Sequence, residues 1–265
     1  AVTRDAAWLE SEAIQTLDMR NAQCIGEDGL ARFYGYEEDP CRVLLIDFVQ
    51  NYIERLSRAA RVLDRRELAV EAVQQAAGHA SELMTRDGLF LQGRGWLADE
   101  DELSPAPWSR GQGWILLGLT AAWKELDPWP DLQATLGEVI QHHANSLRRW
   151  QDDNGFLRFI VDDLSEASHP ETSGTGMVAW ALASAIGSGC LDRDSYARIA
   201  RDFASAALSH VTESGEVLHV SPGPGPLAEA KPYLNTAGET DNPHGIAAVI
   251  WAAAALHLLD NPPDA

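Results

Sequence analysis

Hydrophobic residues recur along this chain with the three-to-four-residue spacing of half-buried helices. Ala69, Val73, Ala76 and Ala77 show this spacing within a single stretch, which is typical of one face of a helix. Stretches of this kind, rich in Ala, Leu and Arg, alternate with glycine-containing turns along the chain. We therefore predict helices at residues 4–22, 41–63, 66–85, 110–126, 131–150, 172–188, 193–211 and 243–259.

The predicted helices fall into two kinds. Those at 110–126, 172–188 and 243–259 are apolar nearly all round, whereas those at 66–85 and 193–211 carry more charge. A helix that is apolar on every side is buried on every side. The pattern therefore indicates inner helices that alternate with outer ones.

Four similar turns divide the chain into units of comparable length. Their glycines are Gly29, Gly88, Gly155 and Gly215, at intervals of 59, 67 and 60 residues, and each is followed by a short, partly β-prone run. A recurring period of this size indicates stacked supersecondary units. We predict an all-α protein, an α/α toroid of helical hairpins that forms one domain over residues 1–265.

In such a toroid the inner helices begin at one rim, just after the long turns. Polar residues at those starts would then converge on a pocket: Asp47, Trp108–Trp114, His169–Thr175 and Asp241–His244. The Pro/Gly-rich run Ser221–Pro226 lies inside a hairpin, so we interpret it as a long rim loop and not as a linker.

The charge of the chain limits its partners. Forty acidic side chains against twenty basic ones give a net charge of −20, which disfavours nucleic acid and anionic membrane surfaces. No apolar run reaches the length of a membrane span and no signal-peptide pattern is visible, so we expect a cytoplasmic protein. An anionic substrate would need a local basic group.

The cysteines and the motifs of the chain bear on disulfides and cofactors. Cys24, Cys41 and Cys190 are odd in number and far apart, which favours reduced thiols over a disulfide framework. The sequence shows no phosphate-binding glycine loop, zinc-ligand cluster or nucleophile elbow. We expect neither a cofactor nor a metal.

The segment Trp108-Ser-Arg-Gly-Gln-Gly-Trp114 gathers groups suited to an acidic sugar at a predicted helix start. Two indoles offer flat apolar faces to a sugar ring, and Arg110 offers a planar fork that fits a carboxylate. Gly111 and Gly113 permit close approach by a ligand or by another helix. The alternative is that both tryptophans are core anchors and that Arg110 caps a neighbouring helix.

This segment, followed by Glu171-Thr-Ser-Gly-Thr-Gly-Met177 and Ala179-Trp-Ala-Leu-Ala183, resembles the unsaturated rhamnogalacturonyl hydrolases. These form glycoside hydrolase family 105, and the unsaturated glucuronyl hydrolases of family 88 are their relatives. Arg86-Asp-Gly-Leu-Phe-Leu-Gln-Gly93 resembles the family's turn between these landmarks. The resemblance implies an (α/α)6 barrel, of which this chain supplies about four hairpins, the missing part being N-terminal.

The resemblance also implies the chemistry. A lyase-made sugar with a C4–C5 double bond and a carboxylate is hydrated, and the product falls apart to expel the next sugar. Matching Leu56-Ser-Arg-Ala-Ala-Arg61 to the family's leucine–arginine stretch puts Asp47 at the position of the catalytic acid/base. Burial beside Leu45 and Ile46 would raise the pKa of this carboxyl. The alternative is an aspartate paired with Arg42 or another arginine.

Two departures from the family pattern concern the site. Gln92 stands where the family usually has a histidine, and the family's second active-site aspartate lies in an N-terminal hairpin with no counterpart here. His244, at another inner-helix start, is a candidate to replace the function lost at Gln92. Thr172 and Ser173 either face the pocket or belong to a helix cap with Glu171. The predicted substrate-binding set is Trp108, Arg110, Gln112, Trp114, Gln92, Thr172, Ser173 and His244, with Arg110 on the carboxylate and Gln112 on a hydroxyl.

These features leave three functional hypotheses open. The first is a hydrolase of unsaturated uronyl oligosaccharides, whose substrate is a small oligosaccharide with a carboxylate. The second is a non-catalytic or degenerate sugar-acid binding protein. The third is a repurposed α/α-barrel enzyme, an epimerase or a hydratase/cyclase. An unfinished toroid leaves apolar helix faces bare, so we also expect self-association through 4–22 or 243–259 to complete the barrel wall.

Overall fold

Each predicted helix forms, with bounds within a few residues of those expected except at the start of the second. The computed structural model describes residues 6–32, 41–96 and 101–262. In it the predicted helices are α1 (Ala6–Ala22), α2 (Ile46–Leu63), α3 (Arg66–Leu83), α4 (Ser109–Glu125), α5 (Pro130–Arg149), α6 (Thr172–Gly187), α7 (Arg193–Ser209) and α9 (Pro243–Asp260).

Three short elements were not predicted. They are the helix α8 (Ala230–Leu234) and the strands β1 (Leu44–Leu45) and β2 (Gly93–Arg94), which pair antiparallel. Because Leu44 and Leu45 pair with β2, helix α2 begins at Ile46, five residues after the predicted start.

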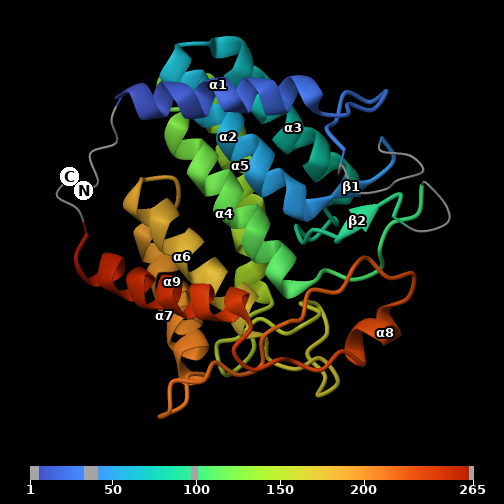
Figure 1. The fold of residues 1–265 in the computed structure, drawn as a ribbon. Coiled ribbons are helices and arrows are strands. Elements are labelled where there is room, and N and C mark those ends of the chain that lie inside the picture. The colour runs from blue at the N-terminus through green and yellow to red at the C-terminus, as the bar shows by residue number, and fades with distance from the viewer. Residues whose placement is uncertain (1–5, 33–40, 97–100, 263–265) are drawn as a thin grey trace.

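The helices alternate between an inner and an outer row. The inner helices α2, α4, α6 and α9 pack side by side in that order, while α1 and α3 pack on α2, α5 packs on α4, and α7 packs on α6 and α9. In Figure 1 the long loops gather at the lower edge of the molecule, beside α8. The inner row is an arc with α2 and α9 at its ends, so the predicted incomplete (α/α) barrel is confirmed.

Close packing between inner helices depends on glycine. A Cβ atom added at Gly118 of α4 would collide with the backbone of Gln50 in α2, and one at Gly176 of α6 with the backbone of Ala248 in α9. Removing side chains at these crossings lets the helices approach closely and bury the aliphatic side chains around them. Core residues such as Leu116 and Leu182 are fully buried as a result.

The four repeated turns are confirmed and share one geometry. Gly29, Gly88, Gly155 and Gly215 all have positive φ, at 77°, 91°, 89° and 89°, a conformation that favours glycine. In each turn an N–H donates to a carbonyl four residues on, at 26→30, 85→89, 152→156 and 212→216. Each turn thus reverses the chain between an outer helix and the run that leads to the next inner helix. The outer helices that precede the four turns are α1, α3, α5 and α7.

Helix α9 is more apolar than we expected. By length and composition alone it is apolar enough to cross a membrane, contrary to our expectation that no segment reaches that length. In the structure it packs along α6 and α7 and buries Ala248, Ala252 and Ala255. Ile246 and Ile250 on the same helix are exposed, so the prediction that this helix is buried on every side is wrong.

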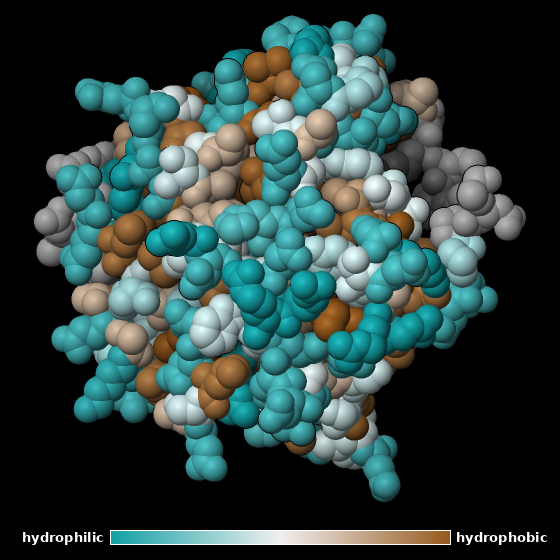
Figure 2. Space-filling model, turned by 180° about the vertical axis from the view of Figure 1, so that it is seen from behind, coloured by the Kyte–Doolittle hydropathy of each residue, from teal (hydrophilic) through white to brown (hydrophobic). Residues whose placement is uncertain are grey.

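The outer surface agrees with the acidic composition. Figure 2 shows a face on which hydrophilic residues predominate and hydrophobic ones are scattered in small groups. Many of the arginines on this chain are neutralised locally: Arg58 pairs with Glu54 at 2.6 Å and Arg66 with Asp131 at 2.6 Å.

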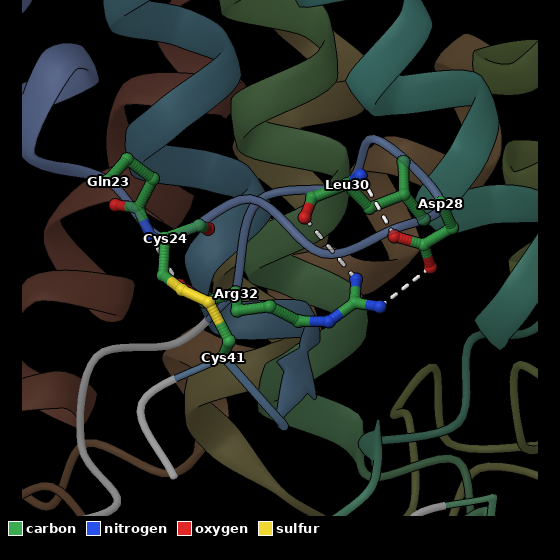
Figure 3. The surroundings of a disulfide bond; sticks show 6 residues. All are labelled: Gln23, Cys24, Asp28, Leu30, Arg32 and Cys41. Atoms are coloured by element: carbon green, nitrogen blue, oxygen red, sulfur yellow. Dashed lines mark hydrogen bonds and ion pairs between the residues drawn. A yellow bond between two sulfur atoms is a disulfide. The ribbon is translucent and has the colours of Figure 1, made fainter.

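Cys24 and Cys41 form a disulfide, with their Cα atoms 5.4 Å apart. Figure 3 shows this bond next to Arg32, whose guanidinium is held by Asp28 and by the carbonyl of Leu30. The prediction of three reduced thiols is therefore wrong for two of them. Cys190 is free and half-buried. No local pattern indicates this pairing, because the two cysteines meet only when the end of α1 and the start of β1 lie together.

Counting thiols tests this bond. The denatured protein, kept without reductant, is expected to react with one equivalent of a thiol reagent, at Cys190, and with three equivalents after reduction. Intact-mass spectrometry after alkylation provides the readout. Three alkylated cysteines before reduction, in protein purified without reductant under oxidising conditions, would show that the bond does not form.

Candidate active site

The starts of the inner helices enclose a pocket of about 290 Å³. Three of the rim segments that we predicted to converge, at the beginnings of α2, α4 and α9, do meet there. The lining residues are Leu45, Asp47, Gln92, Trp96, Trp108, Arg110, Trp114, Gly223, Pro224, Gly225, Pro226 and His244.

Asp47 lies in the first turn of α2, immediately after β1. The pairing of β1 with β2 and the hydrogen bond from Ile46 N–H to the Gln92 carbonyl, at 3.1 Å, fix where this helix begins. Burial raises the pKa of Asp47 to about 6, although the positive charge of Arg110 and a backbone hydrogen bond act in the opposite direction. A carboxyl with this pKa is protonated in part of the molecules near neutral pH and is able to donate a proton.

Arg110 lies in the first turn of α4 and is buried, with 3% of its surface exposed. Its Nη1 atom donates to the Ser221 carbonyl at 2.7 Å, and its guanidinium stacks 4.9 Å from the centre of the Trp108 ring. Desolvation lowers the pKa of Arg110, while Glu171 and Asp47 raise it. Among the described lining residues it is the only one with a permanent positive charge, so it provides the local basic spot that an anionic ligand needs.

The two indoles occupy different positions. Trp108 is buried, and its Nε1 donates to Ser221 Oγ at 3.0 Å. Trp114 is half-buried and meets His244 edge to face, with ring centroids 6.0 Å apart. Burial lowers the pKa of His244, and Arg110 lowers it further. Both effects disfavour the charged form of His244, whose ring lies against the ring of Trp114, a surface suited to a sugar ring.

Gln92 lines the pocket, but its amide group is used by the protein. Its Nε2 donates to the Pro224 carbonyl at 2.6 Å, and its Oε1 accepts from the Tyr233 hydroxyl at 2.8 Å. The side chain thus holds the loop that follows Ser221, a connection that the sequence did not indicate.

Three predicted binding residues point elsewhere. Gln112 is fully buried, and its amide pairs with the N–H and carbonyl of Phe90 at 2.9 and 2.7 Å. Thr172 donates to the Leu218 carbonyl, and Ser173 donates to Glu171. None of the three lines the pocket, so the structure corrects these predictions: their polar atoms stabilise the backbone around the site.

Glu171 caps the N-terminus of α6, which is the alternative role considered for this segment. Its carboxylate accepts from the backbone N–H groups of Ser173 and Gly174 at 2.8 and 2.6 Å. It also accepts from Ser221 N–H at 2.9 Å. The cap of α6 therefore holds one end of the rim loop that passes beside Arg110.

Some pocket residues were missed from the sequence. Trp96 follows the strand β2 and lines the pocket, yet no periodic pattern surrounds it. Gly223–Pro226 was predicted to be a rim loop, which the structure bears out, but not to line the pocket. In the described part of the chain no cluster of three or more His, Cys, Asp or Glu residues has the arrangement of a metal site.

The fold and the pocket together define an α/α-barrel protein with a carboxyl, a guanidinium and indoles at one rim. The sequence model of Glycosyl Hydrolase Family 88 matches residues 47–259. The chain therefore belongs to this family, which agrees with the resemblance drawn from the motifs. The match begins at Asp47 itself.

Individual relatives show the same relationship. An unsaturated 3S-rhamnoglycuronyl hydrolase of Alteromonas sp. (strain LOR) is 28% identical over 173 residues, which are 64% of this chain and 40% of the relative. The chain therefore spans less than half the length of that protein.

Solved structures share the fold. A protein of Salmonella enterica described as a possible member of the GH105 family has a TM-score of 0.83 at 22% identity, covering 98% of this chain and 68% of the other. The unsaturated glucuronyl hydrolase of Bacillus sp. GL1 has a TM-score of 0.72 at 15% identity, covering 97% of this chain and 70% of the other.

Proposed function

We propose that this protein hydrolyses unsaturated uronyl oligosaccharides, of rhamnogalacturonyl or glucuronyl type, by hydrating the C4–C5 double bond. The observation that supports this most is the pocket itself. It contains a carboxyl whose pKa is raised to about 6, a buried arginine and the indoles of Trp96, Trp108 and Trp114. The Alteromonas relative is named for an activity of this type.

The proposed reaction begins with the protonated Asp47. Its proton passes to C4 of the vinyl ether, and the double-bond electrons form the new C4–H bond, which leaves an oxocarbenium-like centre at C5. Water adds to C5 and returns one proton to the Asp47 carboxylate. The resulting hemiketal opens and releases the next sugar. One carboxyl thus acts as acid and then as base, unlike the paired carboxylates of displacement mechanisms.

The other pocket groups have assigned roles in this proposal. Arg110 pairs with the uronyl carboxylate and offsets the net charge of −20, which would otherwise repel the substrate. Trp108 and Trp114 form the wall against which the ring lies, and His244 adds a polar edge beside Trp114.

A direct assay tests the function. The protein is incubated with an unsaturated disaccharide made by a polysaccharide lyase, and the ultraviolet absorbance of the conjugated double bond is followed. We expect the absorbance to fall as the double bond is hydrated. A constant absorbance with well-folded protein, across both uronyl types, would reject the proposal.

A second candidate is a sugar-acid binding protein without turnover. Two observations favour it: Gln92 stands where the family usually has histidine and uses its amide on the loop, and Asp47 is the single carboxylate lining the pocket among the described residues. Binding of an unsaturated uronide without loss of absorbance, abolished by Arg110→Ala, would establish this candidate. The epimerase alternative needs paired pocket histidines, and His244 alone lines the pocket in the described part of the chain.

Self-association is a separate proposal. The helices at the edges of the fold expose apolar side chains: Trp8 and Ile14 on α1 are 46% and 51% exposed, and Ile246 and Ile250 on α9 are 42% and 63% exposed. We infer that a second copy of the chain covers the α9 edge, because exposed apolar faces of this kind favour association.

Sedimentation velocity tests this inference. We expect a dimer whose dissociation constant rises at least tenfold on Ile250→Glu, since a charge would then be buried in the interface. Arg198→Glu, on the outer helix α7, is a control with an exposed side chain. A wild-type protein that stays monomeric up to about 100 µM, well above typical dimer constants, would contradict the inference.

The compartment is also open to test. The cytoplasmic location expected from the sequence stays a prediction. The Cys24–Cys41 disulfide favours an oxidising compartment instead, because cytosolic reductants keep thiols reduced. The thiol count on protein taken directly from its native host separates the two.

A further inference from the structure

The rim loop Ser221–Pro226 is held in place at both ends by residues from distant parts of the chain. Its sequence, Ser-Pro-Gly-Pro-Gly-Pro, contains no side chain that reacts with a sugar. Four of its residues nevertheless line the pocket that contains Asp47. The loop is therefore a wall of the pocket, built mainly from backbone and proline rings.

The first end of the loop is fixed at Ser221, which is fully buried. Its carbonyl accepts from Arg110 Nη1 and its hydroxyl from Trp108 Nε1, at 2.7 and 3.0 Å. Its N–H donates to Glu171. Three contacts on one residue position the wall against the groups assigned to the substrate carboxylate and ring.

The second end is fixed by a clamp that consists of Gln92 and Tyr233. Gln92 Nε2 donates to the Pro224 carbonyl, and the Tyr233 hydroxyl donates to Gln92 Oε1. The same hydroxyl accepts from Leu227 N–H at 2.9 Å. Tyr233 is fully buried in α8, so this short, unpredicted helix has a defined role: it carries the clamp.

Close contacts leave the wall little freedom to move inward. A Cβ atom at Gly223 would lie 2.6 Å from Arg110 Nη2, and one at Gly225 would lie 3.4 Å from the Trp96 ring. Pro224 and Pro226 fix their own φ angles. The position of the loop is therefore set by its anchors, and loosening an anchor lets the wall move away from the sugar.

We propose that Gln92 and Tyr233 are positioning residues that set substrate affinity through this loop, and that Gln92 does not act on the substrate chemically. The effect on substrate affinity rests on the proposed function. The role of Gln92 and Tyr233 in holding the loop does not depend on it. The wall presents no charged side chain, so it fits an uncharged part of the bound sugar. Affinity, and not proton transfer, is what the clamp controls.

Tyr233→Phe is the variant that tests the clamp, because it removes one oxygen atom and keeps the ring that fills the core. Tyr196→Phe is the matched control: Tyr196 is also buried, and its hydroxyl donates to Asn145 on the outer helices, away from the pocket. Circular dichroism melting shows whether both variants remain folded.

Hydrogen exchange measured by mass spectrometry reports on the loop without any substrate. The peptide that covers residues 221–229 contains the N–H groups of Gly223 and Leu227, both hydrogen-bonded in the wild type. We expect this peptide to exchange about tenfold faster in Tyr233→Phe, the effect of one lost hydrogen bond, and at the wild-type rate in Tyr196→Phe. Unchanged exchange in Tyr233→Phe would overturn the clamp.

Kinetics separate positioning from chemistry. For the unsaturated disaccharide we expect Tyr233→Phe to raise KM about tenfold and to keep kcat within about twofold, with the pH profile of kcat unchanged. Gln92→Asn, which is too short to bridge Pro224 and Tyr233, should behave in the same way. A large fall in kcat for Gln92→Asn beside normal kinetics for Tyr233→Phe would overturn the proposal and assign Gln92 to catalysis. If the wild type is inactive, the proposed function fails, while the exchange experiment still decides whether the clamp exists.

Discussion

Replacement of Asp47 by asparagine is expected to lower kcat on an unsaturated uronyl disaccharide by about 10²–10⁴-fold, the typical contribution of a general acid or base. The amide has the shape of the carboxyl but cannot give a proton to C4. KM should change little, because the amide keeps the polar contact with the substrate. Initial rates from the ultraviolet assay, with melting curves to show an intact fold, provide the measurement.

The pH dependence of the wild type sharpens this prediction. The reaction needs Asp47 protonated, and burial raises the pKa of this group to about 6. Activity, measured as kcat/KM, should therefore fall by about tenfold per pH unit above pH 6. Asp162→Asn is the control: desolvation also raises the pKa of Asp162, but this aspartate is exposed and lies outside the pocket. Loss of activity in both variants, or in neither, would remove Asp47 from its assigned role.

Replacement of Arg110 by alanine is expected to lower kcat/KM by about 10²-fold or more, since two hydrogen bonds between a guanidinium and a carboxylate would be lost. A second effect follows from electrostatics. The positive charge of Arg110 lowers the pKa of Asp47, so its removal should raise that pKa further. The descending limb of the pH profile should then move to higher pH.

Arg110→Lys provides the control for these two effects. Lysine keeps the charge but loses the planar fork and the stacking on Trp108. The pH profile of this variant should stay close to that of the wild type while its KM rises. A profile that is identical for the alanine variant, the lysine variant and the wild type would show that Arg110 does not act on Asp47. An unchanged KM in both variants would show that Arg110 does not hold the substrate.

The fold could be predicted from local patterns because its elements are regular. Apolar spacing indicated the helices, and the recurring glycines indicated the turns, since each turn needs one residue with positive φ. The strands β1 and β2 were missed because two-residue elements have no periodicity. The Cys24–Cys41 pairing and the clamp on Tyr233 were missed because they join segments that meet only in the folded chain.

The site was predicted in part for a similar reason. Asp47, Arg110, Trp114 and His244 lie at inner-helix starts, and a toroid brings those starts to one rim. The prediction that Gln112 lines the pocket was wrong, although the helical spacing in the sequence indicates where its side chain points. Arg110 and Trp114 are four residues apart and share a helix face, whereas Gln112, two residues from each, faces the opposite side. Its amide therefore reaches Phe90 and not the pocket.

A crystal structure of the Asp47→Asn variant with a bound unsaturated disaccharide shows whether the pocket holds the sugar as proposed. We expect the sugar carboxylate to pair with the Arg110 guanidinium and the ring to lie against an indole. We also expect the amide introduced at position 47 to be within about 3.5 Å of C4, the distance from which a reacting group attacks. A sugar bound elsewhere on the protein, or one in this pocket whose C4 faces away from position 47, would refute the role proposed for Asp47.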